Sequence, residues 1–208
     1  MKKILFCLLL FALVLSLTAC SNTSVDSNSS SLEKDKTEST NIVQEEKNTD
    51  YTKYFNFALV GDKYTALSIK QNIEIPKVLI VPNKYNGIEV AYTGCELLNG
   101  IPVETIVFES GVQCSYFLCG NGNNCPTLKN IIFLSDDPKD TLRNKINDDN
   151  YMPLQLNKQQ LNGSCKIFVP DSSIDSYKTF NSFFVESYAN FTYPLSQLDA
   201  ELKEYIKK

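Results

Sequence analysis

The sequence contains no histidine and no tryptophan in its 208 residues. The absence of histidine excludes every Ser-His or Cys-His nucleophile pair and every metal site that needs an imidazole ligand. Glycine and proline are missing from the first 60 residues, and only two of the 23 aromatic residues precede position 51. The first 50 residues therefore lack the turn formers and core formers of a globular domain. Residues 51–208 are numerous enough for one domain with a hydrophobic core.

The net charge of −4 is concentrated ahead of that domain. Residues 21–50 carry seven acidic side chains and three lysines, whereas residues 51–208 are nearly neutral, with 15 basic and 17 acidic side chains. Binding to nucleic acid requires a clustered basic face, which a neutral mixture of charges does not provide. We therefore expect no nucleic acid partner.

The N-terminus has the parts of an export signal. Lys2 and Lys3 precede an uncharged apolar run, residues 4–17. This run is too short to cross ~30 Å of hydrocarbon comfortably and is typical of a signal peptide. We therefore predict a cleaved signal over residues 1–19.

The segment Leu17-Thr18-Ala19-Cys20 follows the apolar run and resembles the lipobox of bacterial lipoproteins. The resemblance implies that Cys20 becomes the first mature residue and carries diacylglycerol on its thiol, with palmitate among the acyl chains. Two acyl chains give stable anchoring because each buried CH₂ contributes ~0.8 kcal/mol. We expect Cys20 to hold the protein on the extracytoplasmic face of the cell membrane. The alternative is an ordinary cleaved signal with an accidental cysteine.

Residues 20–50 have the composition of a disordered linker. Half of residues 21–50 are Ser, Thr or Asn, and none is aromatic. Such a segment buries too little apolar surface to offset its ordering entropy. As a flexible coil it would hold the domain ~30 Å from the membrane.

Four short apolar runs recur within the domain, with starts 27, 25 and 36 residues apart. Runs of branched and aromatic residues bounded by Pro, Gly and Asn predict strands. Self-similarity at a period of 20–30 residues is typical of a leucine-rich-repeat solenoid, although any β-rich domain shows several such runs. The runs are Leu79–Pro82, Ile106–Glu109, Ile131–Leu134 and Ile167–Pro170.

Other local signals lie on either side of these runs. Asn86-Gly87 separates two strand-like segments and predicts a hairpin, because both central positions of a type I′ turn need positive φ. Ser196 and Asp199 resemble a capping box for a final helix over residues 196–208. A stripe at helical spacing after the last run predicts a helical cap. It consists of Ile174, Tyr177, Phe180, Phe184 and Tyr188.

The segment from Asn124-Cys125 to Leu128, ahead of the third run, and the segment from Val169-Pro170 to Tyr177 resemble the BspA-like leucine-rich-repeat family of bacterial surface lipoproteins. The resemblance implies a β-rich α+β fold. Its expected form is a short, irregular leucine-rich-repeat-like solenoid over residues 51–195, with an N-terminal hairpin and a C-terminal helical cap. Residues 135–163 form an insertion relative to the repeat. For function, the resemblance implies adhesion or interaction at the cell envelope.

The insertion begins with Asp136-Asp137-Pro138, which predicts the start of a short helix that continues through Leu142 and Ile146. Asp148-Asp149-Asn150 closes it. Carboxylates attract calcium, but the spaced Asp-x-Asp-x-Asn-Gly pattern is missing. We therefore predict a solvated loop rather than a calcium site.

The domain has five cysteines, of which three form a tight cluster. The sequence lacks the Cys-x-x-Cys step and any histidine, which argues against a metal site. A disulfide among Cys114, Cys119 and Cys125 is compatible with an exported protein. The preferred interpretation, which the resemblance to the BspA-like family implies, is that Cys95 and Cys125 fill small interior positions of the stack, where cysteine packs as a small hydrophobe. Cys165 is the fifth. We expect no metal and no cofactor.

Catalytic motifs are also missing. Gly120-Asn121-Gly122 lacks the Gly-Lys-Ser/Thr ending of a phosphate-binding loop. Glu104 and Glu109 are a carboxylate pair that nothing in the sequence brings into one cleft. We therefore predict a protein that is not an enzyme.

The prediction for function is a lipoprotein of the cell envelope whose domain binds a protein or another surface macromolecule. Tyr85, Tyr92 and Tyr116 are candidate contact residues. The alternatives are a catalytic or small-ligand role on the same scaffold and a purely structural role in the envelope.

Overall fold

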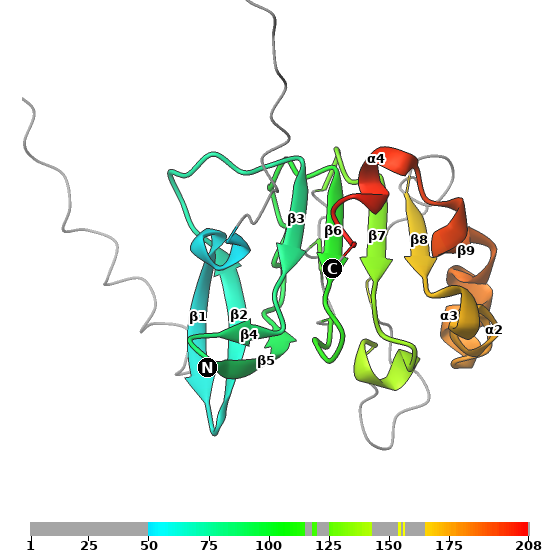
Figure 1. Ribbon diagram of the computed structural model, residues 1–208, viewed down its shortest axis with the longest axis horizontal. Coiled ribbons are helices and arrows are strands. Elements are labelled where there is room, and N and C mark those ends of the chain that lie inside the picture. Colours follow the sequence, from blue (N-terminus) through cyan, green and yellow to red (C-terminus); the bar gives the residue numbers. More distant parts are fainter. Residues whose placement is uncertain are drawn as a thin grey trace, which may run out of the picture. The chain divides into compact units, whose positions relative to one another are not determined.

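A computed structural model describes residues 50–114, 118–119, 125–142, 154, 156 and 165–207. All of them belong to one compact unit, Lys47–Lys208. The signal peptide predicted over residues 1–19, the proposed lipid-bearing Cys20 and all but the last residue of the predicted linker 20–50 lie outside the described residues. The described chain forms two sheets, a four-stranded sheet in the order β1-β2-β5-β4 and a five-stranded sheet in the order β3-β6-β7-β8-β9 (Figure 1).

The four-stranded sheet is mixed and consists of two hairpins. After the 3₁₀ turn η1 (Tyr51–Tyr54), β1 (Phe55–Val60) pairs antiparallel with β2 (Lys63–Ile69). The short β4 (Lys84–Tyr85) pairs antiparallel with β5 (Ile88–Thr93), and β5 lies parallel to β2.

The predicted Asn-Gly turn is confirmed. Asn86 has φ 50° and Gly87 has φ 80°, and positive φ at both central positions is the type I′ geometry.

The five-stranded sheet is entirely parallel. All four apolar runs form strands within it, as predicted: β3 (Val78–Val81), β6 (Thr105–Phe108), β7 (Asn130–Phe133) and β8 (Lys166–Val169). β9 (Thr192–Pro194) forms the far edge beside β8. All four residues of β6 are buried, which explains why these strands appear in the sequence as continuous apolar runs rather than as alternating patterns.

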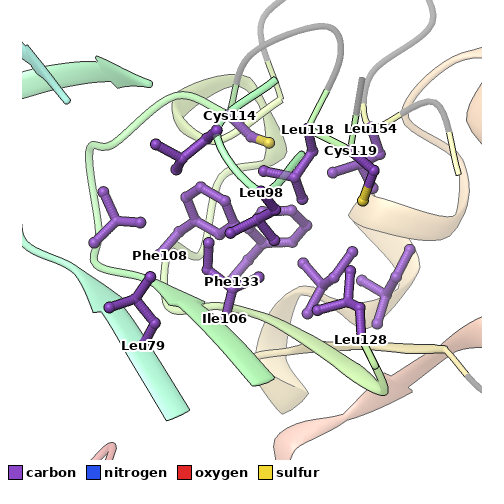
Figure 2. Close-up of a cluster of buried hydrophobic side chains, with 14 of the residues drawn as sticks. Leu79, Leu98, Ile106, Phe108, Cys114, Leu118, Cys119, Leu128, Phe133 and Leu154 are labelled. Atoms are coloured by element: carbon purple, nitrogen blue, oxygen red, sulfur yellow. The ribbon is translucent and has the colours of Figure 1, made fainter. Parts of the chain in front are cut away.

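Both faces of the parallel sheet are covered. On one face, the register aligns Leu79, Ile106, Ile131 and Ile167, and the residues two positions further along β3, β6 and β7 extend the same core. Figure 2 shows Leu79, Ile106, Phe108 and Phe133 pointing into this core together with Leu98, Leu118 and Leu128.

The opposite face of the parallel sheet, lined by Val107, Ile132 and Phe168, is covered by the C-terminal segment. That segment contains η5 (Leu195–Gln197) and α4 (Ala200–Lys203). It buries Leu198 and packs Leu202 against the sheet, and α4 lies over β6 and β7 in Figure 1. The predicted final helix over residues 196–208 is therefore shorter than expected. The helix begins at Ala200 with Asp199 as its N-cap, and Ser196 lies in η5, where its amide donates a hydrogen bond to Asp171. The predicted capping box of Ser196 and Asp199 therefore does not form.

The helical cap predicted after the fourth run consists of two short helices, α2 (Ile174–Lys178) and α3 (Ser182–Ser187), between the 3₁₀ turns η3 (Asp171–Ser173) and η4 (Ala189–Phe191). α3 begins after Asn181, its N-cap residue. The Asn181 side chain accepts a hydrogen bond from the Phe184 amide at 2.7 Å. The predicted apolar stripe is buried as expected at Tyr177, Phe184 and Tyr188.

The start of the predicted helix in the insertion is confirmed only as one 3₁₀ turn. This turn, η2 (Pro138–Asp140), is capped by the Asp137 side chain, which accepts a hydrogen bond from the Lys139 amide at 2.9 Å. The continuation through Ile146 and the acidic cluster Asp148-Asp149-Asn150 lie outside the described residues.

The predicted fold class is wrong. The expected β-rich α+β solenoid of leucine-rich repeats over residues 51–195 would stack similar units, whereas the chain forms one mixed and one all-parallel sheet with few helices, an α/β-type fold. The physical reason lies in the pairing of the second hairpin. β5 pairs with β2 and β4, in the mixed sheet, although it lies between two strands of the parallel sheet along the chain.

Candidate interaction surface

Exposed apolar side chains are concentrated on the mixed sheet. Among the described residues, six large apolar side chains are exposed, and five of them belong to β1, β2 and β5. We call these five the apolar surface: Leu59 (54% exposed), Val60 (64%), Leu67 (46%), Ile88 (37%) and Tyr92 (38%). The sixth, Val185, lies on α3. Single exposed apolar residues are ordinary, whereas several on one small sheet make that sheet the candidate contact region of the described chain.

Strand register divides these residues between the two faces of the mixed sheet, because Leu59 and Val60 are consecutive on β1 and their side chains point to opposite sides. Leu59 and Val60 end β1 at the Gly61-Asp62 turn, where Val60 lies opposite Lys63. One strand inward, Thr65 of β2 lies opposite both Ala58 of β1 and Tyr92 of β5. Ala58, Thr65 and Tyr92 therefore form a row across three strands.

An ion pair flanks the apolar surface. The Lys63 Nζ atom lies 3.0 Å from Glu89 Oε1, linking β2 to β5. Both side chains are about half exposed, so the pair contributes little stability. Together with the neighbouring Asp62 and Lys84, it leaves this part of the surface without net charge.

A cluster of three aromatic rings holds the first hairpin against the second. The rings of Phe57 and Tyr85 stack with centroids 4.1 Å apart, and Tyr64 meets Tyr85 edge-on at 5.1 Å. Such pairs contribute about 0.5–1.5 kcal/mol beyond the area that they bury. The cluster fixes β1 and β2 on β4, so the apolar surface is carried by a packed sheet rather than by a loop.

Two of the three predicted tyrosine contacts belong to this region. Tyr92 is part of the apolar surface, whereas Tyr85 is half-buried in the aromatic cluster and serves packing. Tyr116 lies outside the described residues. Leu59, Val60 and Leu67 were not among the predicted contacts. Their signal in the sequence is the Gly61-Asp62 pair between two β-forming segments, which indicates a tight hairpin with an exposed tip.

The cysteines have structural roles. Cys119 and Cys125 form a disulfide with their Cα atoms 5.6 Å apart, which resolves the alternative that the sequence left open. Cys125 is buried, as its predicted interior position requires, but it is oxidised. Cys95 is exposed, so the expectation of an interior position is wrong for this residue.

The remaining cysteines are buried thiols. Burial raises the pKa of the Cys165 thiol to about 12 and raises that of Cys114 well above its usual range. Because the thiolate is the nucleophile and the metal ligand, neither thiol is reactive at neutral pH. Within the part of the chain that the structure describes, no three Cys, Asp or Glu side chains are grouped as metal ligands.

The candidate carboxylate pair is not brought together. Glu104 precedes β6 and Glu109 follows it, so the two lie at opposite ends of the strand. Glu104 lies between Lys129 and Lys77, and hydrogen bonds from both ammonium groups lower its pKa. Glu109 accepts a hydrogen bond from the Asn83 amide at 2.9 Å. Both carboxylates therefore connect neighbouring segments, and they do not form an acid–base pair.

No family model, curated protein or solved structure matches this chain. The resemblance to BspA-like proteins therefore stays a prediction. Within the residues that the structure describes, none of the helices is both long enough and apolar enough to cross a bilayer.

Proposed function

We propose that this chain is a lipoprotein of the bacterial cell envelope, anchored through Cys20, and that its mixed sheet binds another protein through the apolar surface. The observation that carries the binding proposal is the concentration of five exposed apolar side chains on β1, β2 and β5. Complete burial of one Val or Leu side chain contributes about 1.5–3 kcal/mol, so a partner that covers several of them gains substantial affinity.

Two further observations support this proposal. The Cys119–Cys125 disulfide is compatible with an oxidising compartment outside the cytoplasm, which an export signal would reach. The charges beside the apolar surface sum to zero, because Asp62 and Glu89 are matched by Lys63 and Lys84. A neutral surface with apolar residues and one tyrosine is suited to a protein partner rather than to a polyanion.

Binding is tested by passing cell-wall and host-matrix fractions over the immobilised full chain, comparing wild type with a Val60→Lys, Leu67→Lys double variant. The matched control is Val185→Lys, because Val185 is also an exposed apolar residue but lies on α3. We expect the double variant to retain less than about one tenth of the bound protein, since buried lysines leave unpaired charges in the interface. Equal retention by the double variant and by the control would refute the proposed binding surface.

Anchoring is tested separately by mass spectrometry of the mature chain and of the Cys20→Ala variant. We expect the mass of a diacylglyceryl group on the wild-type N-terminal peptide and its loss in the variant. An unmodified Cys20 in membrane-derived protein would disprove the anchor and leave the binding proposal intact.

A further inference from the structure

β1 is an edge strand of the mixed sheet. Among the residues that the structure describes, it pairs with β2 alone, and in Figure 1 it lies at the outer edge of the labelled strands. Its residues, Phe55–Val60, include no charged side chain and no proline. Charges and prolines are the usual devices by which edge strands avoid pairing with other chains. The register shift beside Asn56 and Phe57 comes from one extra residue on β2, Leu67, so β1 itself carries no bulge. The Phe55 amide donates a hydrogen bond to the Thr52 carbonyl, which leaves residues 56–60 as the open part of the edge.

The hairpin geometry shows which backbone groups of β1 point outward. The turn has two central residues, and Gly61 at the first of them has φ 68°, as in a type II′ turn. In such a hairpin the flanking pair, Val60 and Lys63, exchanges hydrogen bonds, and pairs alternate from there. The amide and carbonyl groups of Leu59 and Phe57 therefore point away from β2, toward the open edge.

We propose that two copies of this chain pair antiparallel through β1, with Ala58 on the two-fold axis. In this register Phe57 lies opposite Leu59 of the second copy, and Leu59 lies opposite Phe57 of the second copy. The outward-pointing amide and carbonyl groups of Phe57 in one copy then form hydrogen bonds with those of Leu59 in the other copy. The two mixed sheets become one continuous sheet.

Other registers are less favourable. A shift by one residue pairs the outward-pointing backbone groups of one copy with residues of the other copy whose backbone groups point toward β2. It also brings the side chains of Phe57 and Ala58, which belong to opposite faces of β1, onto one face of the joined sheet. Centring the axis on Leu59 places Phe57 opposite Gly61, in the turn. Centring it on Phe57 places Leu59 opposite Phe55, whose amide already donates a hydrogen bond to the Thr52 carbonyl. The register centred on Ala58 is the one that avoids all three problems.

A second copy fits this edge because the strand is complementary to itself. Phe57 and Leu59 are two residues apart and lie on the same face of β1, so each copy covers the half-exposed Leu59 side chain with a Phe57 ring. Ala58 is small, so the axis is not crowded. No charge on β1 opposes a second β1. The paired segment is short, and the expected association is therefore weak in dilute solution and stronger where copies share a surface.

The proposal is tested by cysteine cross-linking of the full chain. Ala58→Cys is introduced with Cys95→Ser, which removes an exposed thiol, and dimers are counted on non-reducing gels after mild oxidation. Residues opposite each other in a non-hydrogen-bonded antiparallel pair have Cβ atoms about 4.5–5.5 Å apart, close enough for a disulfide after small adjustments. We expect about tenfold more dimer than in the Cys95→Ser parent, which carries the remaining cysteines.

The matched control is Thr65→Cys in the same parent. Thr65 lies opposite Ala58 on β2 and on the same face, but it is one strand further from the axis. With strands ~4.8 Å apart, the two Thr65 positions are separated by roughly 14 Å, too far for a disulfide. Equal cross-linking of the two variants would overturn the proposal, because it would show random collisions rather than a fixed register.

A second variant tests the edge itself. Leu59→Lys added to Ala58→Cys should reduce the dimer to the level of the parent, whereas Val185→Lys should leave it unchanged. Circular dichroism checks that each variant keeps the wild-type fold. A folded Ala58→Cys chain that stays monomeric while still binding a protein through the apolar surface would overturn self-pairing and leave the proposed function standing.

Discussion

The backbone oxygen of Leu67 lies 2.1 Å from the point that a Cβ atom on Gly94 would occupy. The Gly94 amide also donates a hydrogen bond to the Ala66 carbonyl at 2.8 Å. The chain leaving β5 therefore runs against the backbone of β2, and only glycine leaves room for this contact. The contact connects the strand that carries Leu67 to the strand that carries Tyr92, within the apolar surface.

Gly94→Ala should destabilise the fold by about 3 kcal/mol, because the clash is with backbone atoms that have no alternative rotamer. Chemical denaturation of the wild type and the variant measures this loss. Gly61→Ala is the control, since Gly61 has φ 68° and no atom within 4 Å of its ideal Cβ position. It should lose only the cost of a left-handed conformation, about 1–2 kcal/mol. Equal losses of stability in the two variants would contradict the prediction, because they would show that the contact between Gly94 and the Leu67 backbone adds no cost of its own.

Tyr177→Phe should cost about 1–2 kcal/mol, because it leaves a buried acceptor without its donor. The Tyr177 hydroxyl lies 3.0 Å from the Ser135 carbonyl oxygen and 3.2 Å from Thr141 Oγ1, and the residue is fully buried. These contacts hold α2 on the segment that follows β7. Denaturant unfolding measures the effect.

The control for Tyr177→Phe is Tyr193→Phe. Tyr193 contacts the Phe168 ring and lies under the Lys166 ammonium group, and a phenylalanine preserves both ring contacts. We expect a smaller loss there. A loss at position 177 no larger than that at position 193 would contradict a structural role for the buried hydroxyl.

The sequence is informative where the signal is local. The continuous apolar runs identify β3, β6, β7 and β8, and Asn86-Gly87 identifies one hairpin, because branched side chains and positive-φ turns restrict the backbone within a few residues. The buried stripe through Tyr177 and Phe184 is likewise local, although its break at Asn181 depends on a side-chain cap that competes with a continuous helix.

What the sequence does not show is the pairing between distant segments. β5 could join the parallel sheet or the first hairpin, and its parallel contact with β2 depends on the close approach at Gly94, which has no signature in the spacing of apolar residues. The solenoid prediction failed at this point. The burial of a single cysteine also depends on distant segments. The prediction of an interior position is therefore wrong for Cys95, although it is right for Cys125.

Acid should remove a contribution that Glu104 makes to stability. Hydrogen bonds from Lys129 and Lys77 lower the pKa of this carboxyl in the folded state below its ordinary value of 4.5. A carboxyl with a lowered folded-state pKa stabilises the fold fully above its ordinary pKa, and this contribution is lost as the pH falls through the lowered value. The difference in melting temperature between wild type and Glu104→Gln should therefore be largest near neutral pH and should vanish in strong acid.

The control for this pH dependence is Glu74→Gln. Glu74 is an exposed carboxylate that forms no ion pair with any residue that the structure describes. Its substitution should not change the pH profile. High salt should reduce the Glu104 effect, because the three side chains are solvent accessible and their attraction is screened. A Glu104→Gln profile parallel to that of wild type would contradict a role for the carboxylate charge.

Reduction of the Cys119–Cys125 disulfide should lower the free energy of unfolding by about 2 kcal/mol, the value expected for a short closed loop whose unfolded chain is no longer constrained. Unfolding curves with and without dithiothreitol measure this, and a Cys119→Ala, Cys125→Ala double variant should be insensitive to the reductant. Cys114 and Cys165 provide an internal reference. Their burial and raised pKa values should protect both thiols from alkylation until the chain unfolds. If reduction of the disulfide alone makes them reactive, the disulfide also keeps the folded core closed, in addition to restricting the unfolded chain.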